Sequence, residues 1–307
     1  MTKHLARILS EMVAFFQKFH NKSTKNEESL EDLPKRYIRL AHRDHKRDLE
    51  LNKYFTDMYV DLFSKKSWKE RKFINFGPGS FKHKFWQNAD RYYQGKKSWS
   101  DIRDNKYKMQ IDIEWNLLEN KEIDVESDTI EVCYCSHLIE HAWDDNVQFF
   151  FKDVHRVLKE GGVFRVVCPD IDLGIEAYRN KDKYFFINNK SAQPIPYKLL
   201  EYNSLITHKE NSTCLSPDEA DDFIKKHKNE YEALNEASRL SDKEVQNKYA
   251  AHVNWFNEEK VVKFLKDAGF KTIRVNGYKQ SICPVLRDAR YFDKTDPEVS
   301  LYIDAIK

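Results

Sequence analysis

Between residues 128 and 170 the chain alternates between strand-like and helix-like patterns, and this alternation constrains the fold more than any other feature. Residues 129–135 (TIEVCYC) and 163–168 (VFRVVC) have the short, β-branched and aromatic character of strands. Residues 144–159 place apolar side chains at helical spacing, and Gly161-Gly162 is expected to stop this helix. Strands that alternate with helices are typical of a parallel α/β sheet.

The same pattern continues on both sides of this segment. Further strands are predicted at 72–76, 84–90, 271–275 and 300–306, and a further helix at 257–268. Residues 1–65 contain two helical patterns, 4–20 and 35–65, joined by a polar linker. Residues 181–250 are rich in Lys, Glu, Asn and Asp and contain no glycine. The predicted organisation is an N-terminal helical extension (1–65), an α/β core in two parts (66–180 and 251–307) and an inserted helical cap (181–250).

Composition excludes several classes of protein. With 20 Phe and 16 Tyr among 307 residues, the chain has ample material for a core despite 33% charged residues. The 52 basic and 50 acidic residues leave a net charge of +2, which argues against a nucleic-acid binder. No apolar run approaches the roughly 20 residues of a membrane span, and Arg7 and Glu11 interrupt any signal peptide. Five cysteines then indicate reduced thiols and a cytoplasmic location.

A glycine pair marks a candidate ligand site. The chain has only eight glycines, yet Gly77 and Gly79 follow the predicted strand 72–76 directly. Glycine lets a ligand lie against bare backbone, and ligands of open α/β sheets bind at the carboxyl ends of the strands. The sequence is not G-x-G-x-x-G, which disfavours a dinucleotide; a simple tight turn is the alternative.

Acidic residues near the ends of neighbouring strands are candidates for binding a ribose. Asp90 ends the predicted second strand, and Asp112 is its rival after Met109-Gln110-Ile111. A carboxylate at such a position can accept hydrogen bonds from ribose hydroxyls. An exposed loop acid is the alternative for either residue.

Residues His137, Glu140 and His141 spell H-x-x-E-H, the inverted zinc-protease pattern. On a helix the two histidines would share a face and could bind zinc, but here a strand precedes the motif, which disfavours a protease. Asp170 and Asp172 could bind a metal at the end of strand 163–168, although a helix cap fits them better. The sequence therefore predicts no metal site.

Three motifs together resemble a known family. They are Ser136–His141 (SHLIEH), Arg156–Gly162 (RVLKEGG) and Cys168–Asp170 (CPD), and residues 258–270 add a late helix that ends in Ala-Gly-Phe. Over 66–180 and 250–307 the chain resembles the type 11 group of class I S-adenosylmethionine-dependent methyltransferases. The resemblance implies a Rossmann-like, mostly parallel seven-stranded sheet with helices on both faces, and S-adenosylmethionine as cofactor.

The resemblance also implies roles for individual residues. Gly77 and Gly79 would lie beside the methionine part of the cofactor, Asp90 would bind the ribose, Asn116 and Leu117 would border the adenine, and Ser136 and His137 would lie near the sulfonium. Pro78 departs from the family, where Cys or Ser is common, and the stretch to Asp90 lacks the usual helix.

Methyl transfer to a hydroxyl requires a base, and histidine suits that role near neutral pH. The candidates are His141, His137 and His252, with a hydrogen-bonded structural histidine as the alternative for each. The expected acceptor is a small molecule or a sugar hydroxyl, because the chain resembles members from surface-polysaccharide pathways. Aromatic residues of the cap could stack on a sugar or simply pack the cap: Tyr184, Phe185, Phe186, Tyr197 and Tyr202.

Three other functions stay open from the sequence: N-methylation of a small metabolite, a binding module that has lost catalysis, and a zinc hydrolase. The expected partners are a small-molecule or sugar acceptor and a second copy of the chain, bound through the N-terminal helices. Neither a nucleic acid nor a membrane span is expected.

Overall fold

The structure is a computed structural model that describes residues 49–91, 110–186 and 193–307. The chain divides into two compact units, Met1–Thr56 and Asp57–Lys307. Of the first unit only residues 49–56 are described, and they are helical. The predicted helix 4–20, and with it the expected dimer contact, lies outside the described residues. Among the described helices, none is both long enough and apolar enough to cross a membrane.

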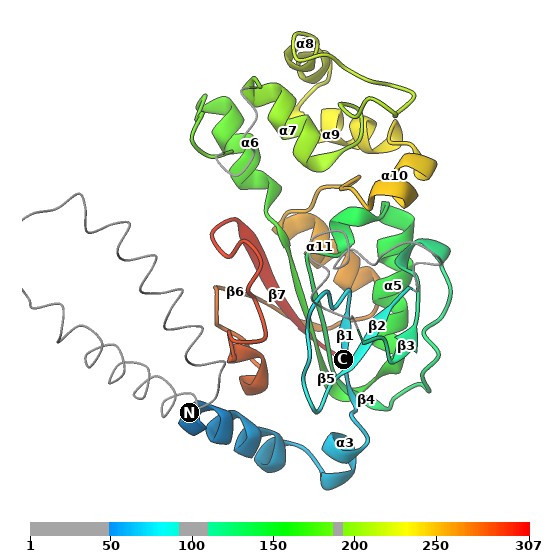
Figure 1. The fold of residues 1–307 in the computed structure, drawn as a ribbon, viewed down its shortest axis with the longest axis vertical. Coiled ribbons are helices and arrows are strands. Elements are labelled where there is room, and N and C mark those ends of the chain that lie inside the picture. The colour runs from blue at the N-terminus through cyan, green and yellow to red at the C-terminus, as the bar shows by residue number, and fades with distance from the viewer. Residues whose placement is uncertain (1–48, 92–109, 187–192) are drawn as a thin grey trace, which may run out of the picture. The chain divides into compact units, whose positions relative to one another are not determined.

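The second unit is built on a seven-stranded sheet with the order β3-β2-β1-β4-β5-β7-β6 (Figure 1). Strands β1 to β5 are parallel, whereas β7 runs antiparallel to both of its neighbours. This confirms the predicted mostly parallel α/β fold. The strands are β1 Phe73–Phe76, β2 Gln87–Asp90, β3 Ile113–Glu114, β4 Ile130–Ser136, β5 Leu158–Pro169, β6 Thr272–Asn276 and β7 Ser300–Ile306.

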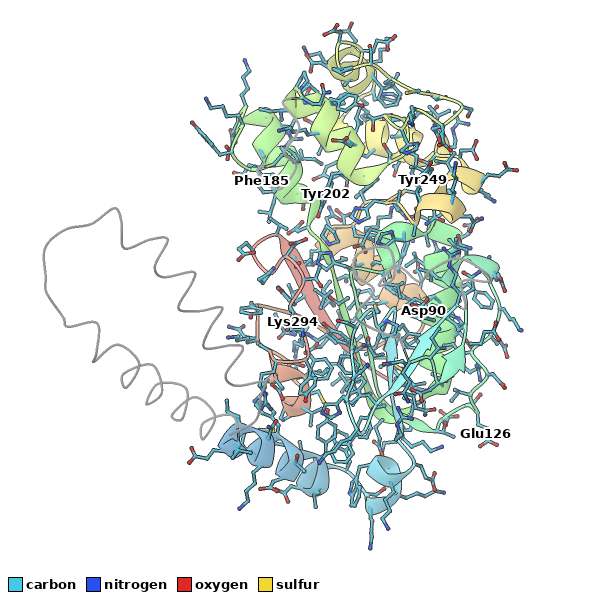
Figure 2. All side chains as sticks on the ribbon, viewed as in Figure 1. Asp90, Glu126, Phe185, Tyr202, Tyr249 and Lys294 are labelled. Atoms are coloured by element: carbon cyan, nitrogen blue, oxygen red, sulfur yellow. The ribbon has the colours of Figure 1, made fainter. Side chains whose placement is uncertain are left out.

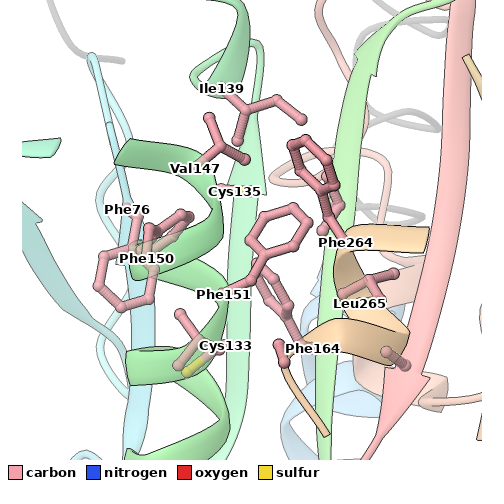
Figure 3. Close-up of a cluster of buried hydrophobic side chains, with 14 of the residues drawn as sticks. Phe76, Cys133, Cys135, Ile139, Val147, Phe150, Phe151, Phe164, Phe264 and Leu265 are labelled. Carbon is pink, nitrogen blue, oxygen red and sulfur yellow. The ribbon is translucent and has the colours of Figure 1, made fainter. Parts of the chain in front are cut away.

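Apolar layers cover both faces of the sheet. Helices α5 (Asp144–Val157) and α11 (Glu258–Asp267) pack on one face, where their buried side chains meet those of β1, β4 and β5 (Figure 3). On the other face, the buried residues come from helical residues 57–62, the loop before β2 and the short 3-10 helix η3 (Pro284–Arg287). The sheet is therefore buried on both sides, as a parallel sheet must be.

A group of helices lies at the carboxyl edge of the parallel strands, because α6 starts directly after β5 (Figure 1). Their apolar faces form a core of their own, which includes Leu199, Leu200 and Leu234. We call this group the cap. Its helices are α6 Ile171–Arg179, α7 Ile195–Asn203, α8 Ala220–Lys225, α9 Glu230–Arg239 and α10 Lys243–Tyr249.

The predicted role of Gly161-Gly162 as a helix stop is wrong. Helix α5 ends at Val157, and the chain enters β5 at once because Leu158 already pairs with Ile130. Gly161 has φ +76°, and a Cβ on Gly162 would lie 2.8 Å from the carbonyl oxygen of Lys159. The pair is needed for this irregular start of the strand rather than for a helix end.

A buried ion-pair network joins the sheet to the segment before β7. Arg165 on β5 is 0% exposed and binds Asp293 and Asp304, with nitrogen–oxygen distances of 2.7 Å to each. Asp304 also accepts hydrogen bonds from the Ser281 hydroxyl and the Ile282 amide, both at 2.8 Å. Both carboxylates hold the pKa of Arg165 above its usual range although burial alone would lower it. The charges are thus paired and hydrogen-bonded, which is the condition for keeping them in a core.

Removal of one partner from this network should be strongly destabilising. We expect Asp304→Ala to lower the free energy of unfolding by about 3–5 kcal/mol, because the Arg165 charge would stay buried without full compensation. Urea unfolding measures the change. The control is Asp267→Ala, which breaks an ion pair with Lys263 whose side chains are 66% and 45% exposed and should cost at most about 0.5 kcal/mol. A loss below about 1 kcal/mol for Asp304→Ala would contradict this account.

Candidate active site

The register of the central strands brings three predicted site segments to one edge of the sheet. Phe76 on β1 pairs with Ala89 on β2 and with Cys135 on β4, and all three strands run parallel. The next residues along each strand are Gly77, Asp90 and Ser136. The structure therefore places the glycine turn, the proposed ribose acid and the start of the histidine motif side by side.

The two glycines of the turn differ in their surroundings. Both have positive φ, +63° at Gly77 and +51° at Gly79, so a residue with a Cβ would be strained at either position. A Cβ on Gly77 would lie 2.8 Å from Leu138 Cδ1, so the loop after β4 packs directly on this glycine. A Cβ on Gly79 would meet no described atom within 4 Å. Backbone that a ligand can approach is thus present at Gly79 and covered at Gly77.

Asp90 has the environment expected of an acid that binds hydroxyl groups. It is half-buried at the end of β2, and burial raises its pKa to about 6 although the Arg91 amide donates a 2.7 Å hydrogen bond to it. A carboxylate in this setting is stabilised by further hydrogen-bond donors, which ribose hydroxyls supply. Figure 2 labels Asp90 on the strand below the cap.

Asp112, the rival candidate, lies two residues before Glu114, the strand partner of Asp90, and its carboxylate is already bound by other groups. It precedes β3, and it forms an ion pair at 2.7 Å with Arg71, which precedes β1. It also accepts a hydrogen bond from the Asn88 amide at 2.9 Å. These contacts hold its pKa below the usual range, although burial opposes them. Because both of its carboxylate oxygens already accept hydrogen bonds from Arg71, we leave Asp112 out of the proposed site.

Asn116 and Leu117 follow β3 at the carboxyl edge. The side chain of Asn116 caps the 3-10 helix η1 (Leu117–Glu119) by accepting a hydrogen bond from the Leu118 amide. Leu117 is 8% exposed and belongs to the main core. Only Asn116 therefore presents a polar group at the position where the family resemblance expects the adenine.

The histidine motif surrounds a buried carboxylate. Strand β4 ends at Ser136, His137 takes the left-handed conformation with φ +50°, and Glu140 lies in the 3-10 helix η2 (Ile139–His141). Glu140 is only 2% exposed, and its Oε1 lies 3.3 Å from His137 Nδ1. The other ring nitrogen of His137 bonds Ser300 Oγ at 2.8 Å. The motif is therefore at a strand-to-loop junction, as the sequence predicts, and not on a protease-like helix.

The third candidate histidine joins the same cluster from a distant part of the chain. His252 Nε2 lies 3.9 Å from Glu140 Oε1, and its ring centroid lies 4.6 Å from that of His141. The Val253 and Asn254 amides donate to the carbonyl oxygen of Glu140 at 2.9 and 3.2 Å. The segment that returns from the cap thus docks on η2. We call Glu140 with His137, His141 and His252 the histidine cluster.

The cluster sets the charge of its members. Burial would raise the pKa of Glu140, but the three histidines, His137 foremost, hold it at about 2. Burial and the neighbouring His141 lower the pKa of His252 to about 4. Burial would also lower the pKa of His137, yet Glu140 keeps it above the usual value. At neutral pH the cluster therefore contains an ionised carboxylate and a neutral His252.

The remaining sequence candidates have structural roles or lie apart. Asp170 caps α6 through a hydrogen bond from the Asp172 amide at 3.1 Å, as predicted for a helix cap. Of the cap aromatics, Phe186 is buried in the cap core and Phe185 and Tyr197 pack against it, so these three are not free to stack on a sugar. Tyr184 is 66% exposed, and Tyr202, labelled in Figure 2, lies beside the histidines, with its ring 5.2 Å from that of His252.

A surface groove of about 650 Å³ lies away from these residues. Its walls come from the start of α6, from α9 and from one side of α11 along its whole length, and include Asp172, Tyr231 and Lys263. No predicted site residue lines it.

The arrangement defines a class of protein: a Rossmann-like α/β fold with an antiparallel seventh strand, whose candidate site lies at the carboxyl ends of β1, β2 and β4. Residues 87–166, from β2 to the middle of β5, match the family model described as "Methyltransferase domain". This segment and the strand order identify the protein as an S-adenosylmethionine-dependent methyltransferase, EC 2.1.1.-, with S-adenosylmethionine as the methyl donor.

Solved structures of methyltransferases resemble the chain at low identity. An S-adenosylmethionine-dependent methyltransferase from Mesorhizobium loti is 10% identical, with 76% of this chain and 90% of that chain covered and a TM-score of 0.36. One from Archaeoglobus fulgidus is 10% identical, with 83% and 99% covered and a TM-score of 0.35. Human N-acetylserotonin methyltransferase, solved in complex with the cofactor, is 10% identical, with 76% and 47% covered and a TM-score of 0.35. The comparison with curated proteins finds no match.

Asp90 and Asp112 should respond in opposite ways to removal of their charge. The folded pKa of Asp90 is about 6, above the ordinary 3.8, so between these values the native state holds a proton that the unfolded state lacks. Stability therefore falls as the pH rises through this window. We expect Asp90→Asn to raise the free energy of unfolding at pH 8 by on the order of 2 kcal/mol, with no gain at pH 3.5, and to weaken cofactor binding by about 10- to 100-fold.

The matched control is Asp112→Asn. Its folded pKa is depressed, so its charge stabilises the fold at neutral pH, and the substitution should lower stability there while leaving cofactor affinity within about twofold. Urea unfolding at several pH values and calorimetric titration of S-adenosylmethionine measure both quantities. Equal cofactor affinities for the two variants would remove Asp90 from the proposed site.

Proposed function

We propose that the protein transfers the methyl group to a hydroxyl of a small molecule or a sugar, and that the histidine cluster activates this hydroxyl. The observation that carries the proposal is the buried, ionised Glu140 with three histidines around it, in the loop that packs on Gly77. S-adenosylmethionine supplies a methyl group already activated on a sulfonium. A hydroxyl acceptor must also lose its proton, and a histidine of this cluster can act as the base that removes it.

The residues at the edge of the sheet fit such a cofactor. Gly79 leaves its backbone open to a ligand, and Asp90 has an unusually high pKa that donors of hydrogen bonds would lower. In the proposed arrangement Gly77 and Gly79 border the methionine part, Asp90 holds the ribose, Asn116 lies at the adenine, and Ser136 with His137 lies near the reacting carbon.

Within the cluster, His141 is the first candidate for the group that takes up the proton. Its Nδ1 is buried and has no hydrogen-bond partner among the described residues, so it can still bind a proton or a ligand. His137 uses one ring nitrogen on Ser300 and faces Glu140 with the other, and His252 donates from Nδ1 to the Tyr202 carbonyl oxygen at 2.8 Å. The Gln246 amide holds the carbonyl oxygen of His141 at 2.6 Å and so fixes the backbone of that residue.

A hydroxyl is favoured over an amine as the acceptor because an amine needs no strong base once it is neutral, whereas a buried carboxylate–histidine group is suited to removing a proton from oxygen. Tyr202, beside His252, is the cap aromatic placed to contact an acceptor. The comparisons give no link to surface-polysaccharide pathways, and that part of the expectation is not carried forward.

The test is methyl transfer from labelled S-adenosylmethionine to a panel of sugars, phenols and amines. We expect label on hydroxyl acceptors, and we expect His141→Ala to lower kcat by about 10²- to 10⁴-fold while cofactor affinity stays within twofold. The control is His227→Gln in the cap, a histidine that bonds only the Phe223 carbonyl oxygen among the described contacts and should leave kcat unchanged. Transfer to amines alone, or full activity of His141→Ala, would contradict the proposal.

A further inference from the structure

Two buried polar atoms of neighbouring residues, Glu140 Oε2 and His141 Nδ1, have no hydrogen-bond partner among the described residues, whereas Glu140 Oε1 faces His137 Nδ1 at 3.3 Å. Buried polar atoms in folded proteins are nearly always paired, and an unpaired one costs about 1–3 kcal/mol. Two such atoms in one cluster therefore indicate a ligand that satisfies them together.

The geometry of the cluster fits a metal ion. One ligand atom from each of Glu140, His141 and His252 can be chosen so that all three lie within 4.8 Å of one another. Ligands about 2.1 Å from a tetrahedral zinc ion stand about 3.4 Å apart, so small side-chain rotations suffice to bind one. Glu140 Oε1 and His252 Nε2 already stand 3.9 Å apart.

The surrounding contacts hold these atoms in the orientation that a metal ion needs. His252 donates from Nδ1 to the Tyr202 carbonyl oxygen, which leaves the lone pair of Nε2 facing Glu140. A backbone acceptor on the far nitrogen is the usual support of a metal-bound histidine. The backbone of Glu140 is fixed by the Val253 and Asn254 amides, and that of His141 by Gln246. The three groups thus come from two segments that are locked to one another.

We propose that Glu140, His141 and His252 bind a divalent transition-metal ion of the zinc type. Two imidazoles and one carboxylate form the His₂Glu set of catalytic zinc sites, which leaves a position for a non-protein ligand. Imidazole favours zinc and its transition-metal neighbours, whereas magnesium prefers oxygen ligands alone. The H-x-x-E-H pattern supplies two of the ligands, but from a 3-10 turn, and the third comes from the segment after the cap.

Such an ion would assist the activation of the acceptor hydroxyl, and this catalytic role rests on the proposed function. A hydroxyl bound at the open position would release its proton to solvent water more readily, because the positive charge would stabilise the alkoxide that then takes the methyl group from the sulfonium. In that case His141 would bind the metal ion instead of taking up the proton. His137 is not one of the three ligands and would keep its contact with Glu140. The binding of the ion itself depends only on the three side chains.

The test is zinc binding by the full chain after chelator treatment and dialysis. We expect one zinc per chain by elemental analysis, binding by calorimetric titration of zinc chloride that millimolar magnesium does not displace, and a higher melting temperature. Glu140→Gln and His252→Gln should each weaken zinc binding at least tenfold, whereas the control His227→Gln should bind as the wild type does. Cobalt in place of zinc should give a visible absorption spectrum that both ligand variants lose.

The outcomes separate this inference from the proposed function. Absence of stoichiometric zinc in the wild type, equal binding by the ligand variants, or displacement by magnesium would overturn the metal site, even if hydroxyl methylation is found. Zinc bound through the three side chains supports the site even if only amines are methylated, in which case the proposed function fails alone. Calorimetric binding of S-adenosylmethionine by each variant shows that it is folded.

Discussion

The parallel pairing of β1 with β4 at the centre of the sheet is the constraint on which the site depends. Because Phe76 is in register with Cys135, the chain must leave β1 through Gly77 at the level where β4 gives way to His137. Leu138 then occupies the space that any side chain at Gly77 would need. The glycine turn and the loop that carries the histidine cluster therefore contact each other at the carboxyl ends of β1 and β4, and a substitution in one should shift the other.

Two buried charge clusters lie at different places along this sheet and have different characters. Around Arg165 every charge is paired and the carboxylates accept further hydrogen bonds, so the cluster stabilises the junction of β5, β7 and the preceding loop. Around Glu140 only one carboxylate oxygen has a close partner: Oε1 faces His137 Nδ1 at 3.3 Å, whereas Oε2 accepts no hydrogen bond from the described residues. A buried network in which every polar group is hydrogen-bonded indicates a structural role. A network of similar burial with polar groups that lack hydrogen bonds indicates a place for a ligand.

The sequence was sufficient for the elements and for the central part of the site. The strands at 72–76 and 129–135 and the helices at 144–159 and 257–268 were predictable because their periodicity is local, and the edge shared by Gly77, Asp90 and His137 follows from parallel pairing. Contacts across long separations were not predictable. Nothing local to Arg165 indicates Asp293, and nothing local to Asp112 indicates its ion pair with Arg71. The prediction for Gly161-Gly162 was wrong because glycine is favoured both at the end of a helix and at an irregular start of a strand, so the pair alone does not distinguish the two.

The position of His252 in the chain links the cap to the histidine cluster. This histidine lies on the stretch that leads out of the inserted helices and back to the sheet, and the same stretch is anchored on the main-chain oxygen of Glu140. Shortening or exchanging the cap would therefore move a nitrogen of the histidine cluster as well as the cap itself. Under the proposed function, a change in the cap that alters acceptor binding would also alter the group that handles the proton, because His252 lies between α10 and α11.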